Sequence, residues 1–220
     1  MADIFTPKII RSNRRTLTLS VASDATLVVK APLFVSMGDI QSFINKHKDW
    51  IDKRTKKVEA VAQKQFSSGE TYLYLGTHHI LQFGEYKNIQ AKGGKILFPK
   101  FLQFRAKKEL TNWYIQKAKD LITAQVKYYA PQMKAKYKTV SFADTKSRWG
   151  VCTHDNHLQF NWRLVMAPLL VINYVVVHEL THTIEKNHSF LFWNKVRYFN
   201  PTFKHQRNWL KTHGDILTIG

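Results

Sequence analysis

The chain has 220 residues, of which 44% are hydrophobic and 13% aromatic, enough for a packed core in one ordinary domain or two small lobes. Its single cysteine, Cys152, excludes an internal disulfide, residues 1–15 lack a secretory signal, and the longest uncharged run, 164–177, is too short for a membrane span. The 34 lysines and arginines outnumber the 15 aspartates and glutamates, and a net charge of +19 attracts polyanions. We therefore expect a globular protein in a reducing, cytoplasmic compartment, with no membrane contact.

The first hundred residues show patterns of short strands around one helix. Residues 16–21 alternate strictly, and residues 26–30 form a second strand, which together predict a β-hairpin. Ser36 followed by Asp39 is typical of a helix start, and helical spacing then continues to about residue 64. Three further short strands are expected between glycines, at 72–75, 79–83 and 96–98.

The second half is mainly helical. The pattern predicts a helix from Phe101 that Ala130-Pro131 ends, and a helix that starts at Pro168 and runs to about Lys186. Two strands are expected between them, at 140–142 and 158–162. Ser189 can cap another helix, Asn200-Pro201 breaks it, and a last helix ends near Gly214. The sequence thus predicts an α+β fold with a β-rich lobe over 1–100 and a catalytic lobe over 101–220.

The motif His178-Glu179-Leu180-Thr181-His182 lies on the helix expected over 168–186. Residues four apart share a helix face, so His178 and His182 can bind one metal ion, while Glu179 lies beside the open position and can take a proton from a metal-bound water. The motif also arises by chance in helices. However, Val175, Val176 and Val177 make the preceding turn apolar, and polar side chains on a buried helix need a partner, which a metal supplies.

A catalytic zinc site needs a third protein ligand, for which Glu185, Asp215 and His188 are candidates. We favour His188, which can reach the metal only if the helix ends before it. Asn187 makes such an end plausible, because asparagine tolerates the left-handed conformation that closes many helices. The spacing matches that of metzincin proteases, except that Glu185 stands where those enzymes have glycine.

Other polar residues have simpler interpretations. Neighbours in a strand point to opposite faces, so His78 and His79 cannot both bind one ion, and Cys152 is read as a small buried residue although a thiolate could bind a metal. Tyr174, one turn before His178, and Arg148 are candidates for substrate binding, with packing and a structural ion pair as the alternative. Residues 158–162 are the candidate edge strand for an extended peptide.

The ordered set of short motifs resembles the YgjP-like metallopeptidases, relatives of the SprT and WLM zinc proteins. The matching segments of the second half are Ser147-Arg148-Trp149-Gly150, Asn161-Trp162-Arg163-Leu164, Ala167-Pro168, 174–180, Asn187-His188-Ser189 and Phe192-Trp193. Further matches are Arg14-Arg15-Thr16, Lys30-Ala31-Pro32, Trp50-Ile51, and Pro201 with Trp209-Leu210-Lys211. The departures from the family pattern are Val151, Thr153 and Thr183.

The resemblance implies one composite zincin-like domain with one Zn²⁺ per chain. It also implies that His178, His182 and His188 are the zinc ligands and that Glu179 is the catalytic residue. The expected function is a zinc-dependent hydrolase, foremost a metallopeptidase acting on peptides. The same resemblance leaves open a nucleoside triphosphate (UTP) pyrophosphatase and a nucleic-acid-associated protease. Lysines are spread along the chain without a nucleic-acid motif, so a solvated basic face with at most non-specific nucleic-acid contact is expected. No oligomeric state is predicted.

Overall fold

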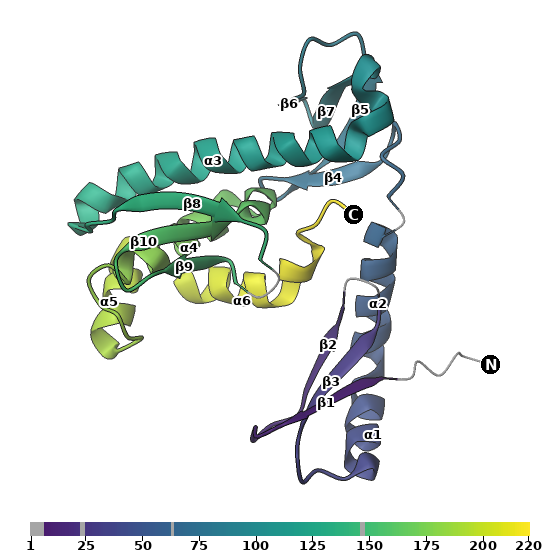
Figure 1. The fold of residues 1–220 in the computed structure, drawn as a ribbon, viewed down its shortest axis with the longest axis vertical. Helices are drawn as coiled ribbons and strands as arrows, with labels where there is room; N and C mark the ends of the chain where they lie inside the picture. The colour runs from purple at the N-terminus through teal and green to yellow at the C-terminus, as the bar shows by residue number, and fades with distance from the viewer. Residues whose placement is uncertain (1–6, 23–24, 63, 146–147) are drawn as a thin grey trace. The chain divides into compact units, whose positions relative to one another are not determined.

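The computed structural model describes residues 7–22, 25–62, 64–145 and 148–220, and Figure 1 shows their arrangement. The chain divides into two compact units, residues 1–65 with Gly220, and residues 66–219. In the described part of the chain, no helix is both long and apolar enough to cross a membrane.

The sheet of the first unit has three strands in the order β1-β3-β2, where β1 is Lys8–Ser12, β2 is Thr18–Val21 and β3 is Leu27–Pro32. Strands β2 and β3 are antiparallel, which confirms the predicted hairpin, although residues 23–24 of its turn lie outside the described residues. Strand β1 pairs in parallel with β3 and was not predicted.

Two helices pack on this sheet, α1 (Met37–Lys46) and α2 (Lys48–Ala62), where the sequence predicted one helix to residue 64. The Ser36 hydroxyl accepts a hydrogen bond from the Asp39 N–H at 3.1 Å, as expected of a cap. The break falls at His47, where a ring nitrogen lies 2.8 Å from the Phe43 carbonyl. That carbonyl is the one that the His47 N–H would bind in a continuous helix, so the side chain replaces a backbone bond.

The second unit starts with a four-stranded sheet in the order β4-β5-β7-β6. Its strands are β4 (Thr71–Tyr74), β5 (Thr77–Gly84), β6 (Gln90–Lys92) and β7 (Lys95–Pro99). The three strands predicted in this stretch are present, and β6 is an additional short edge strand. Its turn to β7 uses Gly93 and Gly94 at positive φ, a conformation that suits glycine.

A short 3₁₀ helix, η1 (Lys100–Arg105), leads into the long helix α3 (Ala106–Met133). The predicted helix end at Ala130-Pro131 is therefore wrong, since Pro131 lies inside the last turn. The helix ends instead at Met133 and is capped by Lys134, a left-handed residue whose N–H and that of Ala135 bind the carbonyls of Pro131 and Ala130. One side of α3 is fully buried along its length, at Leu110, Tyr114, Ala118, Ile122 and Val126.

A second sheet of this unit has the strand order β8-β10-β9, with β8 over Thr139–Ala143, β9 over Gly150–Cys152 and β10 over His157–Asn161. Figure 1 shows α3 running beside β8. Strand β10 is parallel to β8 and antiparallel to β9. The prediction that 158–162 is an edge strand is therefore wrong, because both edges of β10 are paired. The edge strands of this sheet are β8 and β9, and the three residues of β9 are too few to show a strand period. Ser147, the first residue of the predicted motif before β9, lies outside the described residues together with Lys146.

The remaining elements are mainly helical: η2 (Trp162–Met166), α4 (Leu169–Thr181), α5 (Phe190–Phe199), α6 (Phe203–His213) and η3 (Gly214–Ile216). Helix α4 packs against α3, α5, α6 and β9, so it lies at the centre of the unit. The predicted cap is confirmed, since the Ser189 hydroxyl accepts from the Phe192 N–H, and α5 ends at Asn200 as expected.

Helix α4 ends at Thr181, earlier than the predicted end near Lys186, and Asn187 does not have a positive φ. At this end the N–H groups of Thr183 and Ile184 bind carbonyls three residues back, and two threonine hydroxyls bind helix carbonyls as well. The Thr181 hydroxyl donates to the Val177 carbonyl at 2.7 Å and the Thr183 hydroxyl to the Leu180 carbonyl at 2.8 Å. Such side-chain bonds compete with the helix ladder. The chain therefore leaves the helix axis directly after the motif.

The division between the two units falls between Gln65 and Phe66, not near residue 100. The physical reason is a shared core, because Leu81, Ile96 and Phe98 of the four-stranded sheet belong to the same buried cluster as α3 and α4. The observed architecture is α+β, with a small N-terminal sheet and its helices followed by a mainly helical part.

Candidate metal centre

Three histidines converge where α4 ends. His178 lies on α4, His182 caps its C-terminus, and His188 lies in the following loop. Their ligand atoms all lie within 4.8 Å of one another, and the described residues contain no other such group of histidine, cysteine or carboxylate side chains. Glu185, Asp215 and Cys152, the other candidates from the sequence, are outside this group.

Two of the three donors have the spacing of ligands on a tetrahedral metal ion. The Nε2 atoms of His178 and His188 lie 3.2 Å apart. Two nitrogen ligands about 2.0–2.1 Å from a tetrahedral zinc would lie roughly 3.3 Å from each other. Two facing imidazole nitrogens without a proton between them repel one another, and a cation between them removes that repulsion.

The protonation states also suit metal binding. Burial lowers the pKa of His178 to about 3, with further lowering from His182, His188 and Arg207, so this imidazole is neutral. Burial likewise lowers the pKa of His182. The Nδ1 atom of His182 lies 3.1 Å from the Glu185 carbonyl, so it donates there and leaves Nε2 free for a metal. Glu185 thus supports the site through its backbone.

An aromatic side chain forms the floor of the site. Phe192 is fully buried, and its ring centroid lies 4.9, 4.5 and 4.7 Å from those of His178, His182 and His188. Trp193 stacks on His188 at 5.4 Å. Phe190, which starts the same helix, does not pack here, because it is 77% exposed. Phe192 and Val196 share one face of α5, and Phe190 starts the helix on another.

Glu179 is the acidic group of the site, and only 5% of it is exposed. Its carboxylate accepts a hydrogen bond from the Cys152 N–H of β9, while burial raises its pKa to about 8. Strand β9 passes very close to it. A Cβ added to Gly150 would lie 2.6 Å from the Glu179 Cγ and Oε1 atoms, so any residue other than glycine would displace the Glu179 side chain.

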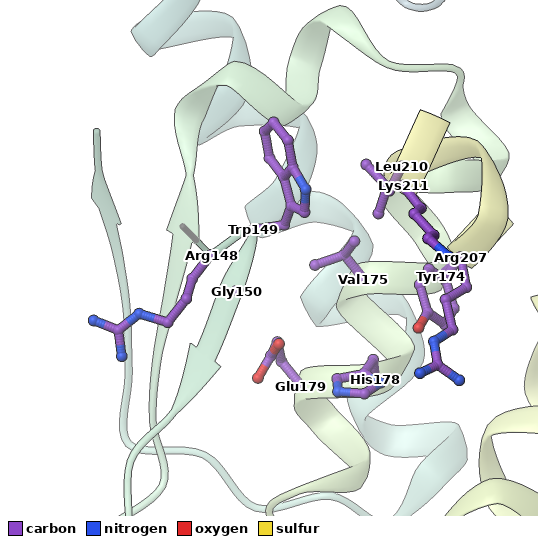
Figure 2. A pocket seen from close by; sticks show the side chains of 10 residues that line it. All are labelled: Arg148, Trp149, Gly150, Tyr174, Val175, His178, Glu179, Arg207, Leu210 and Lys211. Carbon is purple, nitrogen blue, oxygen red and sulfur yellow. The ribbon is translucent and has the colours of Figure 1, made fainter. Parts of the chain in front are cut away.

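A pocket of about 330 Å³ lies between α4, α6 and the start of β9 (Figure 2). Tyr174 lines it and makes a T-shaped contact with His178, with 5.8 Å between the ring centroids, and burial raises the pKa of its phenol. Arg148 also lines the pocket, but Figure 2 shows its guanidinium pointing away from Glu179 and His178.

Two cations of the pocket were missed from the sequence. Arg207 and Lys211 reach it from α6, the last helix of the chain, and Figure 2 shows the Arg207 side chain on the side of Tyr174 and His178. Their spacing of four residues on one helix face is visible in the sequence. Only the packing of α6 on α4 connects that face with the motif.

The family model of the YgjP-like metallopeptidase domain matches residues 15–213. The chain belongs to the YgjP-like metallopeptidase family. The matched range contains the three histidines, Glu179 and the pocket-lining part of α6. No curated protein and no solved structure is similar enough to the chain to count as a match. Membership of the YgjP-like family favours a metal-dependent hydrolase, and the three histidines are the group that could hold its metal.

Proposed function

We propose that the protein is a zinc-dependent metallopeptidase, in which His178, His182 and His188 hold the metal and Glu179 is the general base. The observation that carries this proposal is the convergence of three imidazoles beside a buried carboxyl group at an open pocket. Three histidines with one position left for water and substrate are typical of catalytic zinc. The family match supports the same reaction class.

Zinc, when bound, lowers the pKa of a coordinated water towards neutrality and polarises the scissile carbonyl. Glu179 accepts a proton from the attacking water, and the water oxygen forms a bond to the carbonyl carbon. The C–N bond then breaks, and Glu179 passes the proton to the leaving amine. A carboxyl group whose pKa is raised by burial suits both steps, and a cation at the histidines would shift that pKa back downwards.

The Cys152 N–H fixes the orientation of the Glu179 carboxylate during these transfers. Because β9 is an edge strand, an extended peptide paired with it would pass directly beside Glu179. The buried Tyr174 phenol keeps its proton at neutral pH and is the candidate donor to the developing oxyanion.

A nucleotide hydrolase is the second candidate function. Arg207 and Lys211 at the pocket and the net charge of +19 favour an anionic substrate. A metal-activated water can attack phosphorus as well as carbon. The third hypothesis, a nucleic-acid-associated protease, rests on the family resemblance and on the net charge.

The test is a comparison of wild type with Glu179→Gln on a peptide library and on UTP, with zinc content measured in parallel. We expect wild type to cut peptides and the variant to be about 10²- to 10⁴-fold slower with the same zinc content. Glu185→Gln is the matched control, because Glu185 contacts the site through its carbonyl and its carboxylate lies outside the histidine group. Hydrolysis of UTP but not of peptides by wild type would favour the nucleotide function. Equal peptide cleavage by both proteins would contradict the role of Glu179.

A further inference from the structure

Two cations face the pocket from one side of α6. Arg207 and Lys211 lie four residues apart on this helix and both line the cavity. Within the described residues, neither side chain forms an ion pair or hydrogen bond with a carboxylate. Among the described residues that line the pocket, Glu179 is the one acidic side chain, and it is buried on the opposite side, against β9. The α6 side of the pocket therefore carries uncompensated positive charge.

The Arg207 guanidinium lies over an aromatic ring. Its guanidinium carbon lies 5.2 Å from the centroid of the Trp193 ring, and Trp193 stacks on Phe203 at 5.3 Å. Trp193 also stacks on His188, so one aromatic side chain links the guanidinium to a histidine of the metal centre. A guanidinium stacked on a ring keeps its N–H groups free in the plane for a second partner.

The rest of the lining indicates what that partner is. The pocket also has an apolar lining, formed by Trp149, Val175 and Leu210. A nucleoside triphosphate is handled together with Mg²⁺, which needs carboxylate ligands, and the lining offers only the buried Glu179. The volume of about 330 Å³ is at the lower end for ligand pockets. These features suit a short piece of peptide that carries one carboxylate.

We infer that Arg207 and Lys211 bind a carboxylate of the peptide substrate next to the scissile bond and so determine specificity. This inference rests on the proposed peptidase function. The planar Arg207 guanidinium matches a carboxylate in a two-point contact, and Lys211 adds a second charge from the next turn of α6. The carboxylate is either the free C-terminus of the peptide or an acidic side chain, and both have the same chemistry at this position.

The first experiment compares cleavage of matched peptides by the zinc-loaded protein, followed by mass spectrometry. One pair differs only in a C-terminal carboxylate or carboxamide, and the amidated peptides of a second set carry Asp or Asn at each position in turn. We expect kcat/KM to be about 10-fold or more higher for one type of carboxylate peptide, the size of an effect of charge-assisted hydrogen bonds. A preference for the free terminus identifies a carboxypeptidase, and a preference for Asp identifies an acidic subsite within a longer chain.

Substitutions connect this preference with the pocket. Arg207→Gln and Lys211→Gln should each reduce the ratio of carboxylate to neutral peptide by about 10-fold, mainly through KM. Arg207→Lys keeps the charge but not the planar guanidinium that contacts a carboxylate at two points, so its ratio should lie between those of wild type and Arg207→Gln. Lys204→Gln is the matched control, because Lys204 is an exposed cation of the same helix that does not line the pocket. It should leave the ratio unchanged.

A binding measurement makes the inference independent of turnover. Fluorescein-labelled carboxylate and neutral peptides are titrated with metal-free protein, and anisotropy reports the dissociation constants. Tighter binding of the carboxylate peptide by wild type, lost in Arg207→Gln, supports the inference even if no peptide is cut. Absence of cleavage would overturn only the proposed peptidase function. Equal binding of both peptides, or an unchanged preference in Arg207→Gln and Lys211→Gln, overturns the inference that these two cations bind a carboxylate. Stronger competition by UTP or inorganic phosphate than by acetate and succinate overturns it in favour of a phosphate site.

Discussion

Gly150 of strand β9 and Glu179 of helix α4 touch so closely that a methyl group cannot be placed between them. A Cβ on Gly150 would lie 2.6 Å from the Glu179 Oε1 atom and 2.8 Å from its carboxyl carbon. The edge strand and the buried carboxyl group therefore fix each other's position. The N–H of Cys152, two residues after Gly150, donates a hydrogen bond to the same carboxylate.

Gly150→Ala should displace Glu179 while leaving the histidines in place. We expect peptidase activity to fall by about 100-fold, because small misplacements of a catalytic group have effects of that size, and the free energy of unfolding to fall by about 1–3 kcal/mol. Zinc content should stay at the wild-type value. Gly38→Ala is the control, since a Cβ there meets nothing closer than the Ser36 Oγ at 3.7 Å. Full activity of Gly150→Ala would contradict the close contact.

Lys186 links the histidine loop to the turn between β9 and β10. Its Nζ donates to the carbonyls of Thr153 and His154 at 3.3 and 3.0 Å and to the Asn156 Oδ1 at 2.5 Å. Lys186→Met keeps the length of the side chain but removes these bonds, and we expect zinc affinity to fall by about 10-fold, as when outer contacts of a metal site are lost. The measurement is competition for zinc with a fluorescent chelator. Lys127→Met, an exposed position on α3, should have no effect, and an equal effect of both substitutions would count against the link.

The stability of the metal-free protein should depend on pH through His178. Its pKa is about 3 in the folded protein, and about 6.5 is its ordinary value. As pH falls below 6.5, the unfolded chain binds a proton that the folded protein does not bind until about pH 3, so the free energy of unfolding decreases through this window. Thermal melts with chelator present, from pH 7 downwards, should show a shallower decline for His178→Gln than for wild type. The same decline of stability with pH in both proteins would contradict the lowered pKa of His178.

Local patterns in the sequence were sufficient for much of the fold. The β2–β3 hairpin and the caps at Ser36 and Ser189 depend on residues close together in the chain, and all are confirmed. The three histidines were also chosen from spacing, and the structure brings them together, while their role as zinc ligands stays a prediction.

The errors and omissions concern contacts between distant segments. Strand β10 was taken for an edge strand because its partner β9 has no period of its own. Arg207 and Lys211 were missed because only the packing of α6 against α4 brings them to the pocket. The end of α4 was placed too late, because helical spacing does not reveal that the N–H groups of Thr183 and Ile184 bind carbonyls three residues back instead of four.

The central claim is that the three histidines hold one zinc ion. Elemental mass spectrometry on protein purified without chelator or added metal tests it directly, with His188→Ala beside wild type and His78→Ala as a control at an exposed histidine outside the group. We predict about one zinc per chain in wild type and His78→Ala, and marked loss in His188→Ala, since a catalytic zinc site has three protein ligands. Wild-type protein that holds no zinc and takes up none when it is supplied would contradict the account, as would full retention in His188→Ala.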